Sequence, residues 1–221
     1  MTVSIELQME QMGQRAKKAA RVLSAAAPAA KTQALRALAA LLIERQPDIL
    51  KANALDVDAA KAANMDAPRL DRLTLTPRIM ADMADACLHV AEMADEVGVI
   101  EQQWQRPNGL MIGKMRIPLG VIAMIFESRP NVTIDAAILC LKAGDAVILR
   151  GGSDAICSNI AIVGAIRRAL AKCGADENAV QLIEDTSRET ARDFMRLDKY
   201  VDLLIPRGGA GLIRTVTENS S

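Results

Sequence analysis

The chain has 221 residues, of which 51% are hydrophobic, 24% are charged and 2% are aromatic, and its basic and acidic residues balance to a formal net charge of zero. This composition is typical of a folded globular protein and excludes a disordered one. A neutral chain with so few stacking side chains argues against a nucleic-acid partner, and no apolar stretch reaches the ~18 residues that a membrane span needs.

The first 98 residues have a helical pattern. Apolar residues recur at three- and four-residue steps within residues 5–23, which predicts an amphipathic helix. A second helix is expected after Pro28 and a third from Pro47, while Thr76 fits the N-cap of a fourth. We expect this segment, residues 1–98, to pack on the domain that follows it.

Residues 99–118 predict a β-hairpin. Two β-rich runs flank the dipeptide Asn108-Gly109, a strong turn signal between strands. The hairpin carries Trp104 and several charged residues, so it is expected to be long and partly polar. Such an arm often pairs with another element or another subunit, and we therefore expect a homo-oligomer formed through it.

Residues 119–221 alternate apolar strands with helices. The expected strands are 121–126, 146–149, 180–183 and 201–205, and the helices between them are 131–143, 153–173 and 187–196. Gly144 and Gly174 follow two of these helices, where a left-handed C-cap belongs. Alternation of this kind predicts an α/β fold with a Rossmann-like parallel sheet that is covered by helices on both faces.

The ends of the strands carry the candidate binding residues, because ligands of such sheets bind at the carboxyl ends of the strands. Glycines beside a helix N-terminus let a phosphate approach the free N–H groups, and a neighbouring arginine adds a planar donor fork. The alternative is an ordinary turn between strand and helix, with a solvated arginine. The candidate cofactor-binding residues are Arg150, Gly151, Gly152, Ser153, Arg207, Gly208 and Gly209.

The second strand ends in Arg150, a position that bears on the choice of dinucleotide. An acidic residue there binds the adenosine ribose of NAD, whereas an arginine suits the 2′-phosphate of NADP. Arg150 therefore favours NADP, although Asp154 follows closely and weakens this inference.

Two stretches resemble the γ-glutamyl phosphate reductases, or glutamate-5-semialdehyde dehydrogenases, of the aldehyde dehydrogenase superfamily. They are "FESRPNVTIDAAILCLKAGDAVILRGGS" and "YVDLLIPRGGAGLIRTV", and the resemblance extends over at least residues 117–216. It implies NADPH-dependent reduction of L-glutamyl 5-phosphate to glutamate 5-semialdehyde in proline biosynthesis. It also implies NADP(H) as the cofactor and glutamate 5-kinase as a coupled partner.

The resemblance also implies roles for single residues. Arg150 matches a lysine that contacts the adenosine ribose or its phosphate in relatives, and Gly208 and Gly209 match a turn near the cofactor's pyrophosphate. Arg129 occupies roughly the place of an oxyanion-hole asparagine, and Asn131 lies two residues further on. We take Arg129 and Asn131 as substrate-side candidates, with the acyl phosphate as an alternative ligand of Arg129.

The implied reaction needs a cysteine thiolate as its nucleophile. The relatives carry it in a Gly-Asn-Cys-His type of segment, which this sequence lacks, so the thiol is expected beyond Ser221. We therefore expect this chain to be the cofactor-side portion of such an enzyme, without the catalytic domain. We expect the chain alone to be inactive. The alternatives are a non-catalytic dinucleotide- or phosphate-binding module and an oligomerisation partner.

The remaining reactive residues are expected to be structural. The four cysteines, which are Cys87, Cys140, Cys157 and Cys173, show no CxxC spacing, and His89 is the single histidine, so no metal site is expected. Free thiols indicate a reducing cytoplasm. The acid pairs Asp56/Asp58 and Glu184/Asp185 are predicted to be solvated side chains or helix caps.

Overall fold

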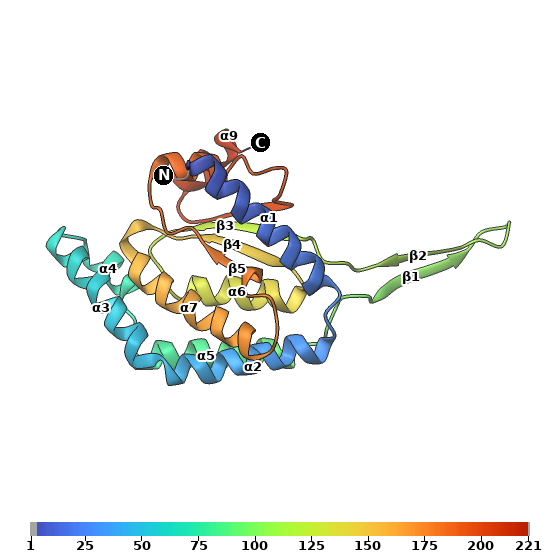
Figure 1. Cartoon of the computed structure of the whole chain (residues 1–221), viewed down its shortest axis with the longest axis horizontal. Helices are drawn as coiled ribbons and strands as arrows, with labels where there is room; N and C mark the ends of the chain where they lie inside the picture. Colours follow the sequence, from blue (N-terminus) through green and yellow to red (C-terminus); the bar gives the residue numbers. More distant parts are fainter. Residues whose placement is uncertain (1–3, 221) are drawn as a thin grey trace.

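A computed structural model describes residues 4–220 of the chain. Along the chain, five helices come first, two hairpin strands follow, and strands then alternate with helices (Figure 1). The first group is α1 (Ile5–Ser24), α2 (Pro28–Glu44), α3 (Gln46–Ala62), α4 (Ala67–Leu73), α5 (Pro77–Glu92), β1 (Ile100–Gln105) and β2 (Met111–Met115). The second group is β3 (Val121–Phe126), α6 (Val132–Ala143), β4 (Ala146–Arg150), α7 (Ile156–Lys172), β5 (Val180–Leu182), α8 (Arg188–Phe194), β6 (Leu203–Arg207) and α9 (Ala210–Asn219).

Strands β3 to β6 form one parallel sheet in the order β5-β4-β3-β6. The side chains alternate between its faces, as the period of two in a strand requires. Val121 and Ala123 pack on the side of α1 and α8, whereas Ile122 and Phe126 pack on the side of α6 and α7. The predicted α/β fold, with a parallel sheet and helices on both faces, is confirmed.

A third layer lies outside α6 and α7. Helices α2 and α5 pack against each other and against α7 and α6, so the N-terminal helices share one core with the sheet (Figure 1). Helix α1 is not part of this layer. It lies on the opposite face of the sheet. No helix in residues 4–220 has the length and apolar character that crossing a bilayer requires.

Local signals fix most helix ends. The Thr76 side chain accepts a hydrogen bond from the Ile79 N–H, as expected of an N-cap, and Gly144 ends α6 in the left-handed conformation with φ 85°. Helix α4 was not expected from the sequence; Asp66 caps it by accepting from the Arg69 N–H, and Pro68 lies in its first turn.

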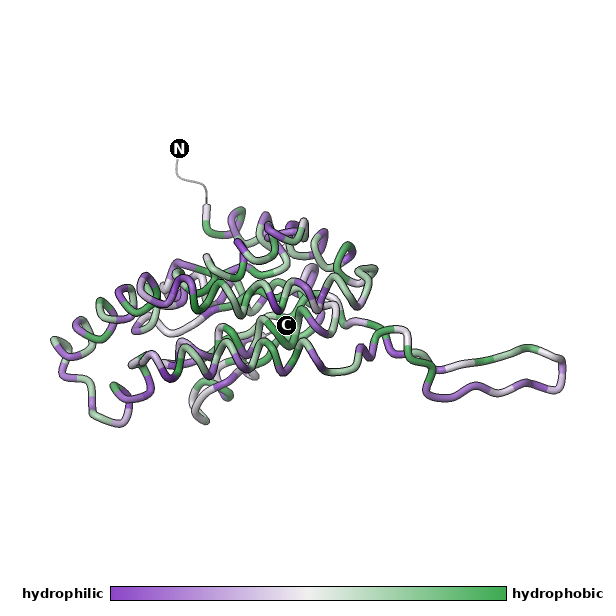
Figure 2. Tube along the Cα trace, turned by 90° about the horizontal axis from the view of Figure 1, so that it is seen from below, coloured by the Kyte–Doolittle hydropathy of each residue, from purple (hydrophilic) through white to green (hydrophobic). Residues whose placement is uncertain are grey.

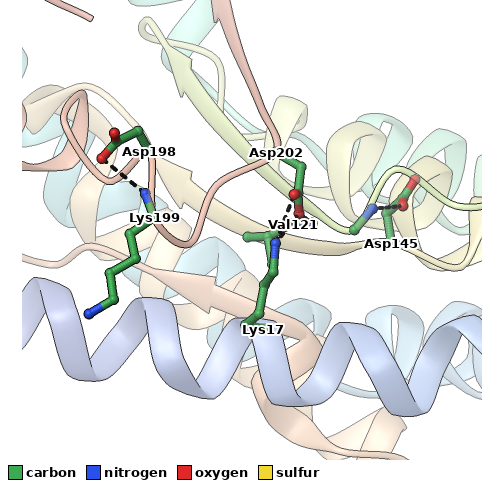
Figure 3. Close-up of polar contacts among 7 residues, drawn as sticks. Lys17, Val121, Asp145, Asp198, Lys199 and Asp202 are labelled. Atoms are coloured by element: carbon green, nitrogen blue, oxygen red, sulfur yellow. Dashed lines mark hydrogen bonds and ion pairs between the residues drawn. The ribbon is translucent and has the colours of Figure 1, made fainter. Parts of the chain in front are cut away.

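The last strand begins at Leu203, two residues later than expected, because Asp202 has another role. Its carboxylate accepts from the Val121 N–H at 2.8 Å and from Lys17 Nζ at 2.7 Å, while the Gly120 N–H donates to Asp145 at 2.8 Å (Figure 3). Burial acts to raise the pKa of Asp202, but hydrogen bonds from Lys17 and the Val121 N–H, together with the Lys17 charge, lower it overall. This network joins α1 and the start of β6 to the start of β3.

The predicted hairpin is confirmed, and it projects from the body as a separate arm (Figures 1 and 2). Its turn differs from a two-residue connection. The Gly109 N–H donates to the Arg106 carbonyl at 2.9 Å, so Pro107 and Asn108 are the central residues, and Gly109 follows with φ 86°. Strand β1 is exposed throughout. Its pairing with β2 places the exposed Trp104 opposite Ile112.

Candidate functional site

Three strand ends meet at one edge of the sheet. Because β3 lies between β4 and β6, residues after Phe126 lie between the glycine pairs that follow the other two strands. A cavity of about 460 Å³ joins the β3 and β6 ends, and it is lined by Arg69, Arg72, Glu127, Ser128, Arg129, Val132, Arg207, Gly208 and Gly209. A neighbouring cavity of about 370 Å³ joins the β3 and β4 ends, and it is lined by Arg69, Glu127, Ser128, Gly152, Ser153 and Asp154.

The β6 end places two glycines against a carboxylate. The Glu127 side chain accepts from the Gly209 N–H at 2.9 Å, and a Cβ on Gly208 would lie 2.6 Å from the Glu127 carboxyl carbon. A side chain at position 208 would therefore displace Glu127. The helix that follows, α9, has no side-chain cap, and a Cβ on Gly211 in its first turn would meet no atom within 4 Å. Ala210 and Gly211 at the start of this helix are exposed, so its N-terminus beyond the Gly209 N–H is accessible to a ligand.

The β4 end turns its arginine away from both cavities. Arg150 Nη2 donates to the carbonyls of Thr186 and Ser187 at 3.2 and 3.0 Å, which ties β4 to the segment before α8. Arg150 is not among the residues that line the two cavities, and its Nε is buried with no hydrogen-bond acceptor among the described residues. Burial lowers the pKa of Arg150, whereas the charge of Asp185 acts to raise it.

The glycines after Arg150 accommodate the protein's own side chains. A Cβ on Gly151 would overlap the Asn159 amide nitrogen and approach the Phe126 ring, and a Cβ on Gly152 would lie 2.5 Å from Asp154 Oδ1. Both positions need glycine because of these close approaches. Ser153 follows and lines the smaller cavity.

The β3 end contains a strained residue. Ser128 has φ 34°, which is uncommon for a residue with a side chain, and its Oγ donates to Asp154 Oδ2 at 2.5 Å. Arg69 of α4 lies 3.8 Å from the same carboxylate. This cluster connects the β3 and β4 ends to α4, a helix that sequence reasoning had missed.

Arg129 and Asn131, which follow β3, lie together beside α5. Both line a third cavity of about 380 Å³ beside α5, and Arg129 also lines the 460 Å³ cavity. Asn131 begins α6 without a side-chain cap. The residues of the 460 and 370 Å³ cavities that were not among the sequence candidates are Arg69, Arg72, Glu127, Ser128, Val132 and Asp154; Asp66 and Pro68 were the signals that could have located the first two.

Three of the four thiols are poor nucleophiles as they stand. Burial raises the pKa of Cys87 and of Cys140 to about 12. Burial and the neighbouring Asp56 also raise the pKa of Cys157, and Cys173, the C-cap of α7, lines neither the 460 nor the 370 Å³ cavity. Within residues 4–220 there is no group of three or more histidine, cysteine, aspartate or glutamate side chains arranged to hold a metal ion.

Comparison with known proteins places this geometry in a family. Residues 3–221 match the aldehyde dehydrogenase family. The chain is 59% identical over 216 residues to a gamma-glutamyl phosphate reductase from Nitratidesulfovibrio vulgaris, covering 98% of this chain and 52% of the relative, and 57% identical over 211 residues to one from Desulfovibrio desulfuricans, covering 96% and 50%. It thus spans about half the length of these curated relatives.

Solved structures agree with this assignment. The crystal structure of gamma-glutamyl phosphate reductase from Thermotoga maritima superposes with a TM-score of 0.94 at 41% identity, covering 96% of this chain and 51% of that one. The enzyme of the same name from Saccharomyces cerevisiae gives a TM-score of 0.90 at 28% identity, covering 96% and 54%. The chain belongs to the aldehyde dehydrogenase family.

Proposed function

We propose that this chain forms the cofactor-side part of an NADPH-dependent γ-glutamyl phosphate reductase, which reduces L-glutamyl 5-phosphate to glutamate 5-semialdehyde in the proline pathway of the cytoplasm. The observation that carries the proposal is the meeting of three strand ends at one sheet edge, where an arginine-lined cavity joins the β3 and β6 ends and a second cavity joins the β3 and β4 ends. A cluster of guanidinium groups suits an anionic substrate and an anionic cofactor. The printed names of the most similar relatives support the same substrate.

The residues at the β6 end fit a nicotinamide dinucleotide, the cofactor type of this family. Helix α9 offers uncapped N–H groups beside open space at Gly211, and Arg207 lies at the start of the same turn with its side chain half-exposed. These groups would hold the pyrophosphate. When bound, the dinucleotide supplies the hydride for the reduction.

The proposed reaction also needs a thiolate that this chain does not offer in a suitable setting. Thiols with pKa values raised to about 12, as at Cys87 and Cys140, stay protonated at neutral pH. This supports the proposal that the nucleophile of the complete reductase is none of the four cysteines described above. Arg129 and Asn131 would face the substrate, since both line the cavities beside the β3 end.

NADPH titration tests the cofactor assignment. We expect the chain to bind NADPH, and Arg150→Ala to weaken NADPH binding by about tenfold but NADH binding by much less, because NADH lacks the 2′-phosphate for which the guanidinium would exchange its bonds to the Thr186 and Ser187 carbonyls. Fluorescence titration measures both affinities. Arg168→Ala removes an exposed arginine of α7 as a control and should change neither. An unchanged ratio of the two affinities in Arg150→Ala would contradict the NADP assignment, and no binding of either dinucleotide would contradict the cofactor role.

We further propose that the hairpin arm pairs with a second copy of the chain. Its apolar side chains are exposed, with Trp104 at 39% and Met111 at 53% of their full accessibility. The double variant Trp104→Glu/Met111→Glu is expected to elute as a lighter species than the wild type in size-exclusion chromatography with light scattering. Leu55→Glu, which changes an exposed leucine of α3, should leave the mass unchanged. A monomeric wild type would contradict this proposal.

Coupling of the complete reductase to glutamate 5-kinase stays a prediction.

A further inference from the structure

Four arginines line the 460 Å³ cavity, and they differ in their partners. Arg69 lies 3.8 Å from the Asp154 carboxylate, and Arg207 lies 3.4 Å from the Asp135 carboxylate. The side chains of Arg72 in α4 and of Arg129 after β3 have neither an ion pair nor a hydrogen bond to any described residue. Two guanidinium groups in one cavity are thus without an anion.

The two unpaired arginines share a position between cavities. Both line the 460 Å³ cavity and also the adjoining 380 Å³ cavity, so they flank the boundary between the two. They come from separate elements, α4 and the β3 end, and therefore approach this boundary from two sides.

The carboxylates around this boundary decide which side an anion would occupy. Asp71, Asp82 and Asp135 line the 380 Å³ cavity and disfavour an anion there. The 460 Å³ cavity has one carboxylate, Glu127, which already accepts from the Gly209 N–H. Net positive charge therefore gathers in the 460 Å³ cavity, on the side where the β3 and β6 ends meet.

We propose that Arg72 and Arg129 together bind the phosphoryl group of the acyl-phosphate substrate, one guanidinium from each side. Planar donor forks of this kind bind two phosphate oxygens at once, and two of them match a phosphate dianion in charge. The assignment rests on the proposed function, and it gives the dinucleotide's pyrophosphate to other residues that line the same cavity, Gly208 and Gly209, together with the start of α9. The same pair would hold inorganic phosphate.

Isothermal titration of the full chain with inorganic phosphate tests the pair directly. Arg72→Gln and Arg129→Gln are each expected to weaken phosphate binding by about tenfold. The double variant should lose less than the product of the two single losses, because both side chains hold one phosphate. Arg78→Gln, an exposed arginine at the start of α5 that lines neither cavity, is the matched control and should stay within about twofold of the wild type. Equal affinities in the wild type and both single variants would overturn the proposal, as would a wild type that does not bind phosphate.

A second titration, in saturating NADP⁺, separates the two sources of phosphate. Retained phosphate affinity supports a substrate site that is distinct from the cofactor. Displacement of phosphate by NADP⁺, with NADP⁺ binding weakened in both arginine variants, would instead assign the pair to the dinucleotide and overturn the proposal. If NADP⁺ does not bind but phosphate binding depends on both arginines, the phosphate site stands and the proposed cofactor role fails.

Discussion

Replacing Gly120 with alanine is expected to lower the free energy of unfolding by about 3 kcal/mol, measured by urea denaturation. Gly120 has φ 122°, a conformation that residues with a side chain rarely adopt. The new Cβ would also overlap the Asp202 carboxylate, which holds the Val121 N–H and Lys17 in place (Figure 3). The start of β3 and the approach to β6 would both shift.

A glycine in open space gives the matched control. Gly164 lies inside α7, and a Cβ there would meet no atom within 4 Å, so Gly164→Ala should raise the free energy of unfolding by about 0.5–1 kcal/mol. An equal response of the two variants would contradict the argument from local geometry.

Acid should reduce the difference between the wild type and Gly120→Ala. The pKa of Asp202 is lowered in the folded chain, so its contribution to stability is complete above the pKa of the unfolded chain and is lost as the pH falls through the folded-state pKa. The variant has already displaced this carboxylate and has less to lose. A difference that stays constant between neutral pH and ~pH 3 would place the whole effect in the strained backbone.

Asp56→Ala is expected to lower the free energy of unfolding by about 3 kcal/mol. The Asp56 carboxylate, only 5% exposed, accepts from the N–H groups of Cys157 and Ser158 at 3.1 and 2.7 Å and from the Ser158 hydroxyl at 2.5 Å. Alanine would leave these donors at the start of α7 buried without an acceptor, and α3 would lose its polar link to the helix that follows β4.

Asp58→Ala separates this effect from a general loss of negative charge on α3. Asp58 is exposed and lies 4.0 Å from Lys61, a distance at which a surface ion pair adds little. Its replacement should change the free energy of unfolding by less than about 0.5 kcal/mol. A comparable loss in both variants would show that Asp56 acts through charge and not through its buried hydrogen bonds.

Particular residues show how far sequence reasoning reached at the site. The ends of β3, β4 and β6 were located to within two residues, because apolar runs and glycines mark a strand end locally. The partners of Arg150 were not foreseen. Its guanidinium donates to the carbonyls of Thr186 and Ser187, which lie more than thirty positions away in sequence. Arg72 was missed because α4 is short and its apolar pattern is weak.

The sequence alone determined the order of the strands and of the helices other than α4, the alternation of side chains across the sheet, and the hairpin arm. Each of these depends on a local period, a cap or a turn residue within a few positions along the chain. The tertiary structure decided which side chains meet: α1 crosses to the second face of the sheet, α4 brings its arginines to the β3 end, and Glu127 reaches Gly209. Such contacts join segments far apart in sequence, and they form only when packing of the shared core fixes the elements in space.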